Sequence, residues 1–442
     1  MTTTPACPVA RGPRGLPVLG VAAEYFRDPA GYTLRLQEDH GGMVDVTLPK
    51  PFVQVTEPEA VDRVLRGNPD NCTRGELYKG FIGYMGRGLL TLDDPQWRPH
   101  RKVVQPAFSR TRITADAEEA VAATRVVLER WATRAGQVFD MAADVMAIST
   151  RTMGQALIGR DLSVPGLGYD RAAAIASKVM YTRTVFGVNE LLPGFLNTRY
   201  QRERRWSHRV IDGVVHAAIT SRRRSGVERG DALDHLLASD LDEQAIRDDL
   251  RTLLLAGTDT TGQALAWTLY ELARHPAVRR EVEDEVDRVL GDAAPTPATR
   301  DELVVTRSAV DEALRLHPPV WQFPRDLIED DVLAGRSVPG GSTVLLSTYG
   351  THRSAEHWTD PEAFDPSRFR DGSTRHRQAY FPFGGGRRMC IGRDLALATL
   401  VTAVAMTTRR FRLTLSSRPV RVGTYITMFP SDGIHVTARE RR

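Results

Sequence analysis

Apolar residues recur at helical spacing along most of the chain. This pattern predicts short helices at 57–65 and 98–108, long helices at about 115–135, 199–224 and 243–274, and further helices at 278–290 and 308–316. Apolar and polar residues alternate from Met43 to Val55, which predicts a hairpin of strands, and short strand patterns return at 342–348, 410–415 and 425–429. The fold is therefore expected to be mainly α-helical with a small β-rich part.

Length and composition are those of an ordinary soluble globular protein, with 442 residues, 41% of them hydrophobic and 26% charged. Because no low-complexity linker and no repeat of fixed period interrupts the sequence, one large domain over 1–442 is expected, with 1–20 as an extended arm rich in Pro and Gly. The net charge of +4 is too small to indicate a nucleic-acid partner by itself, and the basic stretches 199–209 and 222–224 fit a solvated helix face better.

Cysteine content and the N-terminal sequence indicate the compartment. Three cysteines, Cys7, Cys72 and Cys390, argue against a disulfide framework and for a reducing environment. The first residues contain no apolar run of about 20 residues that could span a membrane and no signal-peptide pattern. We therefore expect a cytoplasmic protein without a membrane anchor.

The segment Phe381–Gly392, FPFGGGRRMCIG, is the most specific candidate site, and it predicts a loop that opens into an apolar helix. Zinc would require about four nitrogen or sulfur ligands, and no second cysteine or histidine lies at ligand spacing from Cys390. The pattern suits one axial thiolate on a haem iron, because glycines admit a flat macrocycle and arginines can meet its carboxylates. A cysteine that acts as a small buried hydrophobe is the alternative.

A polar cluster interrupts the apolar helix expected at 243–274. Gly257 is followed by Thr258, Asp259, Thr260 and Thr261, residues that disfavour a helix interior, and such exceptions often mark functional sites. A locally widened helix would leave a carbonyl available to water or dioxygen, and Asp259 beside Thr260 would form an acid–alcohol pair for proton delivery. A helix terminus with capping threonines is the alternative, which the apolar runs on both sides disfavour.

Two further sets of charged residues gain weight from their order along the chain. Glu312 and Arg315 share a helix face before a Pro–Pro pair, and Arg368 could complete a buried cluster that holds the Cys390 segment. Arginine side chains match carboxylate geometry, so a second set could bind two haem carboxylates. This second set comprises Trp97, Arg101, Arg325 and Arg388, with His100 as another candidate donor.

Together these segments resemble the cytochrome P-450 superfamily. The haem-loop pattern F-x-x-G-x-R-x-C-x-G matches at Phe383, Gly386, Arg388, Cys390 and Gly392. The oxygen-activation motif matches AGTDTT at 256–261, the E-x-x-R motif matches EALR at 312–315, and the family's segments before and between them match WRPHR at 97–101 and FDPSRF at 364–369. The matches follow the family's order from 97 to 392.

The resemblance implies a fold and a cofactor. The family's domain is mostly α-helical with a small β-rich corner, and its haem b (iron protoporphyrin IX) lies between the long threonine-bearing helix and the cysteine loop. By this resemblance Cys390 would be the axial iron ligand, and Glu312, Arg315 and Arg368 would form the structural ion cluster. The haem contacts would come from Trp97, His100, Arg101, Ala256, Arg325, Phe383, Gly384, Arg388, Cys390 and Gly392.

The implied reaction is monooxygenation with dioxygen and two electrons, in which Asp259 and Thr260 help to protonate the distal oxygen. The chain resembles the soluble bacterial members, and no reductase domain follows, so the electrons are expected from a separate ferredoxin and ferredoxin reductase. A basic surface is expected to receive the ferredoxin. Its residues are Arg98, Lys102, Arg387, Arg409 and Arg410.

The expected substrate is a hydrophobic molecule such as a terpenoid, fatty or polyketide-like compound, hydroxylated or epoxidised, because the positions that line the family's pocket are mostly apolar here. Gln322 could supply one orienting hydrogen bond. These positions are Phe81, Ile82, Tyr84, Met85, Leu90, Phe186, Leu253, Val320, Gln322 and Ile426. Core packing is the alternative role for each aromatic residue among them.

Three other functions remain open. Oxidative coupling or cyclisation would use the same scaffold without net oxygen insertion, and a peroxygenase would use hydrogen peroxide. The Asp259–Thr260 pair favours dioxygen, because a peroxide user has less need of a proton relay. A haem-based gas sensor is disfavoured by the same pair and by the lack of an output domain.

Overall fold

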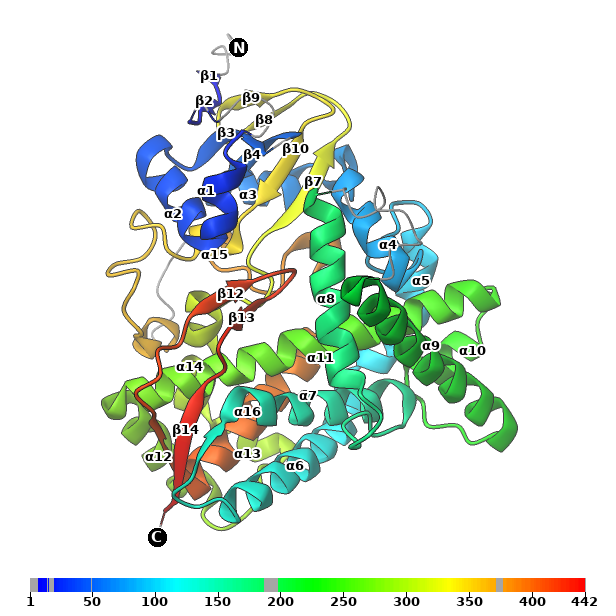
Figure 1. Cartoon of the computed structure of the whole chain (residues 1–442), viewed down its shortest axis with the longest axis vertical. Coiled ribbons are helices and arrows are strands. Elements are labelled where there is room, and N and C mark those ends of the chain that lie inside the picture. Colours follow the sequence, from blue (N-terminus) through cyan, green and yellow to red (C-terminus); the bar gives the residue numbers. More distant parts are fainter. Residues whose placement is uncertain are drawn as a thin grey trace. The chain divides into compact units, whose positions relative to one another are not determined.

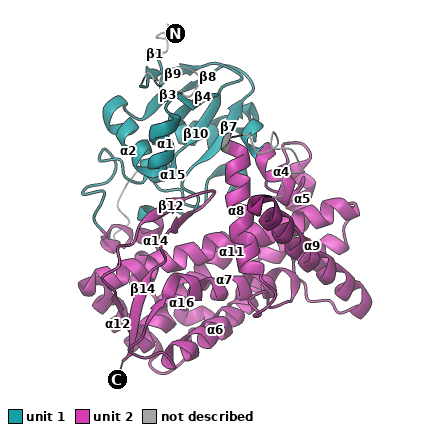
Figure 2. Cartoon of the chain, viewed as in Figure 1, with its two compact units in different colours: residues 1–78, 315–363, 372–390 teal, residues 79–314, 364–371, 391–442 magenta. Residues whose placement is uncertain are grey.

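A computed structural model describes residues 7–13, 15, 20–48, 50–186, 198–370 and 377–441 (Figure 1). The chain divides into two compact units, each assembled from three separate stretches of sequence (Figure 2). The first unit comprises 1–78, 315–363 and 372–390, and the second comprises 79–314, 364–371 and 391–442. The single domain expected from the sequence stays a prediction.

The first unit is built on a mixed sheet with the strand order β2-β3-β4-β10-β7-β5. The predicted hairpin is confirmed, since Met43 pairs with Val55 in antiparallel register. A second sheet has the order β1-β9-β8. The strands are β1 Cys7–Pro8, β2 Ala10–Arg11, β3 Met43–Leu48, β4 Lys50–Val55, β5 Cys72–Thr73, β7 Phe323–Leu327, β8 Asp331–Leu333, β9 Arg336–Val338 and β10 Thr343–Leu346.

Short helices cover this sheet, and apolar side chains such as Val53, Val344 and Leu346 form its core. Asp28 caps α2 by accepting a hydrogen bond from the backbone N–H of Gly31, and Pro29 occupies the first helical position. The helices are α1 Ala22–Arg27, α2 Pro29–His40, α3 Pro58–Asp62, the π-helical η1 Arg63–Gly67, α15 Thr348–Thr351, and the 3₁₀ turns η2 Pro69–Asn71, η3 Glu76–Tyr78, η7 Arg377–Ala379 and η8 Gly386–Arg388.

The second unit is mainly helical, as predicted. Its helices are α4 Lys79–Met85, α5 Trp97–Val104, α6 Arg110–Ala132, α7 Met141–Ile158, α8 Tyr169–Phe186, α9 Arg199–Ser225, α10 Ala232–Leu237, α11 Glu243–Arg274, α12 Pro276–Leu290, α13 Pro297–Glu302, α14 Val304–Leu316 (whose last two residues belong to the first unit) and α16 Arg393–Arg410, with 3₁₀ turns η4 Gln105–Phe108 and η6 Pro366–Phe369. Its strands are β6 Val138–Asp140, β11 Phe411–Leu415, β12 Val422–Thr424, β13 Met428–Pro430 and β14 His435–Glu440.

Helix α11 has the predicted bounds because its ends are marked chemically. Asp242 accepts a hydrogen bond from the N–H of Ala245 at the start, and Pro276 opens the next helix directly after the end. Helix α7 packs along α11, where the hydroxyl of Ser149 donates to the carbonyl of Thr258 at 2.7 Å. This contact fixes the part of α11 that carries the polar cluster.

Three sequence predictions need correction or extension. The strand expected at 425–429 is wrong at its start, because residues 425–427 form the turn between β12 and β13. Helix α6 begins at Arg110, since the hydroxyl of Ser109 caps it by accepting from the N–H of Arg112. Helices α2, α7 and α8 were not predicted.

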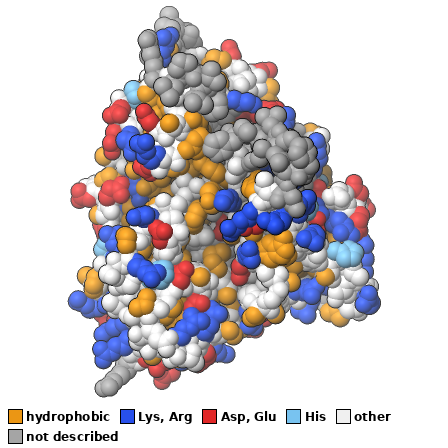
Figure 3. All heavy atoms as spheres, in the orientation of Figure 1, with side chains coloured by type: hydrophobic (Ala, Val, Ile, Leu, Met, Phe, Trp, Pro, Cys, Tyr) orange, Lys and Arg blue, Asp and Glu red, His pale blue; other side chains and the backbone are white. Residues whose placement is uncertain are grey.

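The basic stretch 199–209 lies in α9, where Arg199 pairs with Glu203 at 2.9 Å, as expected for a solvated helix face. Over the face of the molecule in Figure 3, basic and acidic side chains are interspersed. Among the residues that the structure describes, no helix is both long enough and apolar enough to cross a membrane. The cytoplasmic location stays a prediction.

Candidate active site

The cysteine loop of the first unit is closed by its own backbone and by a neighbouring helix. The N–H of Cys390 donates to the carbonyl of Phe383 at 2.9 Å. Gly384 and Gly386 have φ angles of 70° and 64°, a region that favours glycine. A Cβ atom on Gly386 would lie 1.9 Å from the carbonyl oxygen of Leu65, so the loop can approach η1 this closely only with glycine there.

The loop leaves Cys390 exposed, three residues before α16 begins. The second described thiol differs, because burial raises the pKa of Cys72 to about 11 and keeps it protonated. An exposed thiol above a loop bare of bulky side chains at Gly384 and Gly386 fits a planar macrocycle that is ligated through sulfur. Phe383 and Arg388 of the same loop are partly buried.

His352, which sequence reasoning missed, anchors the start of this loop. Its side chain is fully buried and stacks on Tyr380 with ring centroids 5.2 Å apart. Its Nε2 accepts a hydrogen bond from the N–H of Phe381 at 2.9 Å, and its Nδ1 lies 3.2 Å from the carbonyl oxygen of Arg315. This pair of bonds requires the neutral imidazole with its proton on Nδ1. His352 therefore joins the end of α14 to the first residue of the cysteine loop.

The residues of the predicted ion cluster have buried partners on both sides of the cluster. Glu312 is fully buried, lies 3.4 Å from Nε of Arg368 and accepts from the N–H of Asp365. Arg315 is also fully buried, and its guanidinium donates to the carbonyl oxygens of His352, Pro361 and Ala363. Arg315 thus holds the chain segment 352–363, and through His352 it reaches the cysteine loop.

A buried positive cluster surrounds Tyr78 in the first unit. Arg325, a predicted haem contact, and Arg74, which sequence reasoning missed, are each 7% exposed. Both lie within 3.5 Å of the Tyr78 hydroxyl. Burial alone would raise the pKa of Tyr78, but the charges of Arg74 and Arg325 outweigh it and lower that pKa. Two buried guanidiniums provide a site for anionic groups such as carboxylates.

In the second unit, α5 carries three of the predicted haem contacts. Trp97 and His100 are buried and Arg101 is partly buried. Nδ1 of His100 lies 2.6 Å from Oδ2 of Asp249 on α11, and the other oxygen of Asp249 accepts from the N–H of Leu89 at 2.7 Å. The hydrogen bond that His100 donates to the carboxylate of Asp249 raises the pKa of His100. Asp249 was not predicted, since its sequence context resembles a solvated helix turn.

The widening predicted in α11 is wrong, because the helix is continuous α-helix from Glu243 to Arg274. The hydroxyls of Thr258 and Thr260 donate to the carbonyls of Leu254 and Ala256 four residues earlier, at 2.9 and 2.7 Å. Glycine at positions 257 and 262 is instead required by the close packing of a neighbouring helix.

Close packing of α7 explains these two glycines. A Cβ atom at Gly262 would lie 2.4 Å from Sδ of Met146, and one at Gly257 would lie 3.2 Å from Sδ of Met153. Ala256, one turn before Thr260, is exposed although neighbouring residues of α11 are buried. The uncovered side of the helix at this point is therefore the side that Ala256 and Thr260 share.

Asp259 is held by neutral partners. Its Oδ2 accepts from the hydroxyl of Thr427 at 2.6 Å, and its Oδ1 accepts from Nε2 of Gln263 at 3.2 Å. Burial raises the pKa of Asp259, and these two hydrogen bonds only partly oppose it. An acid in this setting can hold a proton nearer to neutral pH than an ordinary aspartate does.

The structure brings several predicted substrate contacts together along α11. Phe81, Tyr84 and Met85 of α4 are buried, Ile82 and Leu90 are partly buried, and Leu253 is buried on α11 itself. The hydroxyl of Thr252 donates to the carbonyl of Met85, which ties α4 to α11. Ile426 is partly buried, and its neighbour Thr427 bonds to Asp259. The hydroxyl of Tyr84 lies 2.8 Å from that of Ser207 on α9, as for a core residue.

The remaining predicted substrate and haem contacts lie in different parts of the structure. Val320 and Gln322 lie in the first unit and are partly buried. Nε2 of Gln322 donates to the hydroxyl of Tyr25 at 2.6 Å, whereas its Oε1 is buried and has no hydrogen-bond partner among the described residues. Phe186 ends α8, and its side chain lies outside the described residues. Gly392 caps α16, with room for a side chain there.

The predicted ferredoxin surface stays a prediction. Arg410 pairs with Glu129 near the end of α6, whereas Lys102 lies on α5, next to the start of α6. From Arg110 to Glu129, α6 runs for about 29 Å. Two of the predicted charges are in ion pairs, Arg387 with Asp70 at 2.6 Å and Arg98 with Asp94 at 3.1 Å, and Arg409 donates to backbone carbonyls.

The mainly helical fold and the glycine-bounded thiol loop define a haem-iron oxidoreductase. The family model for cytochrome P-450 matches residues 10–431. The chain therefore belongs to the cytochrome P-450 family, and it is a cytochrome P-450 monooxygenase.

Individual proteins that resemble this chain are consistent with this family assignment. Cyclooctat-9-en-7-ol 5-monooxygenase of Streptomyces melanosporofaciens is 32% identical over 421 residues, which cover 92% of this chain and 89% of the relative. Cyclooctatin synthase of the same organism is 32% identical over 414 residues, covering 91% of this chain and 89% of the relative. The crystal structure of the cytochrome P450DA heme domain superposes with a TM-score of 0.88 at 26% identity and covers 99% of each chain.

Proposed function

We propose that this monooxygenase hydroxylates or epoxidises a hydrophobic, hydroxyl-bearing small molecule of the terpenoid class, in the biosynthesis of a secondary metabolite. The observation that carries this proposal is the buried Oε1 of Gln322, an acceptor with no partner among the described residues. The relative at 32% identity supports it, because its name specifies the oxidation of an unsaturated alcohol. The apolar character of the residues along α11 supports a mostly hydrocarbon substrate.

The proposed cofactor is haem b. Cys390 would ligate its iron, the arginines Arg101, Arg325 and Arg388 with His100 and Trp97 would bind its carboxylates, and Ala256, Phe383, Gly384 and Gly392 would lie along the macrocycle. When bound, the haem supplies the cleavage of dioxygen and the transfer of one oxygen atom to the substrate. A separate ferredoxin and ferredoxin reductase are proposed as the electron source.

Asp259 and Thr260 are proposed to manage protons for the reaction. Burial between neutral partners raises the pKa of Asp259, so the carboxyl holds a proton more readily than an ordinary aspartate and can pass it on. The hydroxyl proton of Thr260 points to the carbonyl of Ala256. The Thr260 oxygen is thereby oriented as an acceptor, and it can hold a proton-bearing neighbour in place. Such a relay favours dioxygen over hydrogen peroxide as the oxidant.

Gln322 is proposed to fix the orientation of the substrate. Its amide nitrogen is already bonded to Tyr25, so the amide cannot rotate freely, and Oε1 is held in one direction. A substrate hydroxyl that donates to Oε1 would satisfy a buried acceptor that otherwise costs about 1–3 kcal/mol. An analogue that lacks the hydroxyl would leave the acceptor unpaired and bind more weakly.

The test is titration of the ferric holoprotein with pairs of terpenoid alcohols and their deoxy analogues, followed by the spin-state shift of the Soret band. We expect each alcohol that shifts the spectrum to bind about tenfold more tightly than its analogue, the equivalent of roughly 1.4 kcal/mol. Gln322→Leu should remove this preference. Tyr25→Phe should weaken the preference only in part, because it leaves Oε1 in place but removes the hydrogen bond that holds its direction.

Equal binding of alcohols and deoxy analogues to the wild-type enzyme would contradict the role of Gln322. Turnover with a surrogate ferredoxin and reductase under isotopically labelled dioxygen then tests the reaction. Label in the product supports oxygen insertion, whereas an unlabelled coupled or cyclised product would contradict the proposal.

A further inference from the structure

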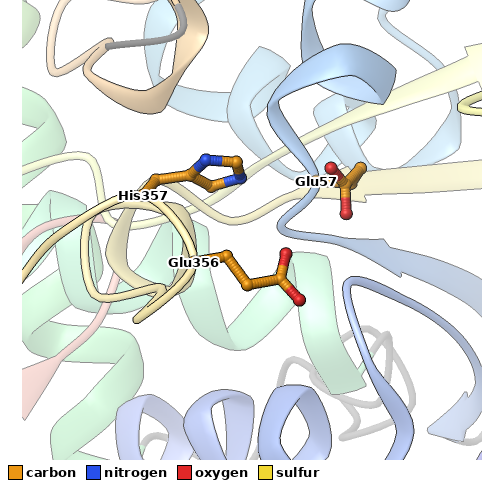
Figure 4. A group of neighbouring side chains, drawn as sticks. All are labelled: Glu57, Glu356 and His357. Atoms are coloured by element: carbon orange, nitrogen blue, oxygen red, sulfur yellow. The ribbon is translucent and has the colours of Figure 1, made fainter.

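Three metal-binding side chains of the first unit meet outside the candidate active site (Figure 4). Glu57 lies two residues after the end of β4 and is the N-cap residue of α3. Glu356 and His357 are neighbours in the turn at 355–357, after α15. One ligand atom from each residue lies within 4.8 Å of the other two. Figure 4 shows the imidazole and the two carboxylates facing a common space.

The carboxylates of Glu57 and Glu356 do not stabilise the surrounding structure. Glu57 caps no backbone N–H of α3, although its position would allow it. Within the described part of the chain, no hydrogen bond or ion pair joins the side chain of Glu57 or Glu356 to another residue. Two carboxylates that face each other without a cation repel, so their arrangement favours the arrival of a positive charge.

His357 supplies an independent sign of a missing ligand. Its Nε2 is buried and has no hydrogen-bond partner among the described residues. Buried polar atoms are paired in the great majority of cases, and each exception needs an explanation. The turn that presents His357 is itself well formed, since the N–H groups of His357 and Trp358 donate to the carbonyl of Ser354 at 3.0 and 2.9 Å.

We propose that Glu57, Glu356 and His357 bind one divalent first-row transition cation, with Zn²⁺ as the best candidate. A mixed set of imidazole nitrogen and carboxylate oxygen suits these ions, whereas Mg²⁺ and Ca²⁺ prefer oxygen ligands alone. Zinc bonds to such atoms measure about 2.0–2.2 Å, so the three groups need only small side-chain rotations to close around the ion. Glu356 is exposed and can make the largest adjustment, and water completes the coordination.

The position of the site gives the ion a structural role. It joins the turn at 355–357 to the junction of β4 and α3. The same chain segment contains the carbonyls of His352, Pro361 and Ala363 that receive the guanidinium of Arg315. A bound ion and the guanidinium of Arg315 would therefore both hold this chain segment in place. Because the ion binds the folded chain, it stabilises the fold in proportion to its concentration and affinity.

The experiment is equilibrium dialysis of the chelator-treated holoprotein against Zn²⁺, with a thermal unfolding curve at each concentration. We expect one tight ion per chain and a melting temperature that rises with Zn²⁺. Glu57→Gln, Glu356→Gln and His357→Gln should each weaken binding by at least about tenfold and remove the thermal shift. Glu59→Gln is the matched control, because Glu59 is an exposed glutamate of α3 two residues away, and it should bind Zn²⁺ as the wild type does.

Glu356→Gln keeps the test decisive even if another variant folds poorly, since an exposed glutamate can be changed with little effect on folding. An unchanged spectrum of the reduced, carbon monoxide-bound protein in that variant would show that the haem site is separate. No tight Zn²⁺ in the wild-type protein, or equal affinity in the wild type and Glu356→Gln, would overturn the proposal.

Discussion

Replacement of His352 by phenylalanine should loosen the cysteine loop without creating a cavity. Phenylalanine keeps a flat ring of similar size, so the stacking on Tyr380 and the edge contact with Phe381 can persist. It has no nitrogen atoms, so the N–H of Phe381 loses its acceptor and the carbonyl of Arg315 loses its donor. Both groups belong to buried residues, and water cannot replace the imidazole there without repacking.

The magnitude follows from these two unpaired groups. Each buried polar group without a partner costs about 1–3 kcal/mol, so the free energy of unfolding should fall by roughly 2–6 kcal/mol. A typical domain has a total stability of about 5–15 kcal/mol, so the variant should still fold. Because the first residue of the cysteine loop is one of the two groups, part of the population should also lose the thiolate ligation of the haem iron.

The assay combines urea unfolding with the spectrum of the reduced, carbon monoxide-bound protein, which reports thiolate ligation. His352→Gln should recover part of the loss, since its amide oxygen can accept the Phe381 N–H. His40→Phe, at the end of α2, is the matched control and should change stability by less than about 0.5 kcal/mol. Full stability and a complete thiolate spectrum in His352→Phe would refute the reasoning.

Two further predictions concern protons. Thr260→Ala and Asp259→Asn should lower product formed per electron pair and release hydrogen peroxide, with turnover about 100-fold slower in Asp259→Asn; unchanged coupling in both would assign the relay elsewhere. The hydrogen bond that His100 donates to Asp249 raises the pKa of His100, with smaller contributions from the charges of Asp242 and Asp248. The stabilisation is therefore complete below the unfolded pKa of about 6.5 and is lost as pH rises through the higher folded value. Urea unfolding at several pH values should therefore give a lower free energy of unfolding for Asp249→Asn than for the wild type, with a difference that is largest in acid and shrinks in alkali. A difference independent of pH would contradict this linkage.

Local sequence patterns predicted the elements whose chemistry lies within a few residues. Helix α11 was placed correctly from its apolar run and from Pro276 directly after its end. The hairpin of β3 and β4 followed from alternation alone. The exposed thiol of Cys390 in a tight loop followed from its glycines, because a left-handed φ is a local property of the backbone.

Helix α7 escaped prediction for a physical reason. Amphipathic periodicity needs a polar side that faces water, and α7 is buried on most of its surface, where even Ser149, Thr150 and Thr152 are inaccessible. These hydroxyls look like surface positions in the sequence. One of them, that of Ser149, instead bonds to a backbone carbonyl of α11. A helix buried on most of its surface therefore resembles an irregular mixture of small polar and apolar residues.

The residues that tune the candidate site were missed because they act across long sequence distances. The acid–alcohol pair was evident because Asp259 and Thr260 are adjacent in the sequence. The pKa of Asp259, however, depends on which side chains surround it. Thr427, in the turn between β12 and β13, and Gln263 face it, and both are neutral. A cation in either place would lower the pKa of Asp259, whereas neutral donors leave burial to raise it. The residue type at 427 thus helps to set the pKa of Asp259, and no local pattern around Asp259 contains that information.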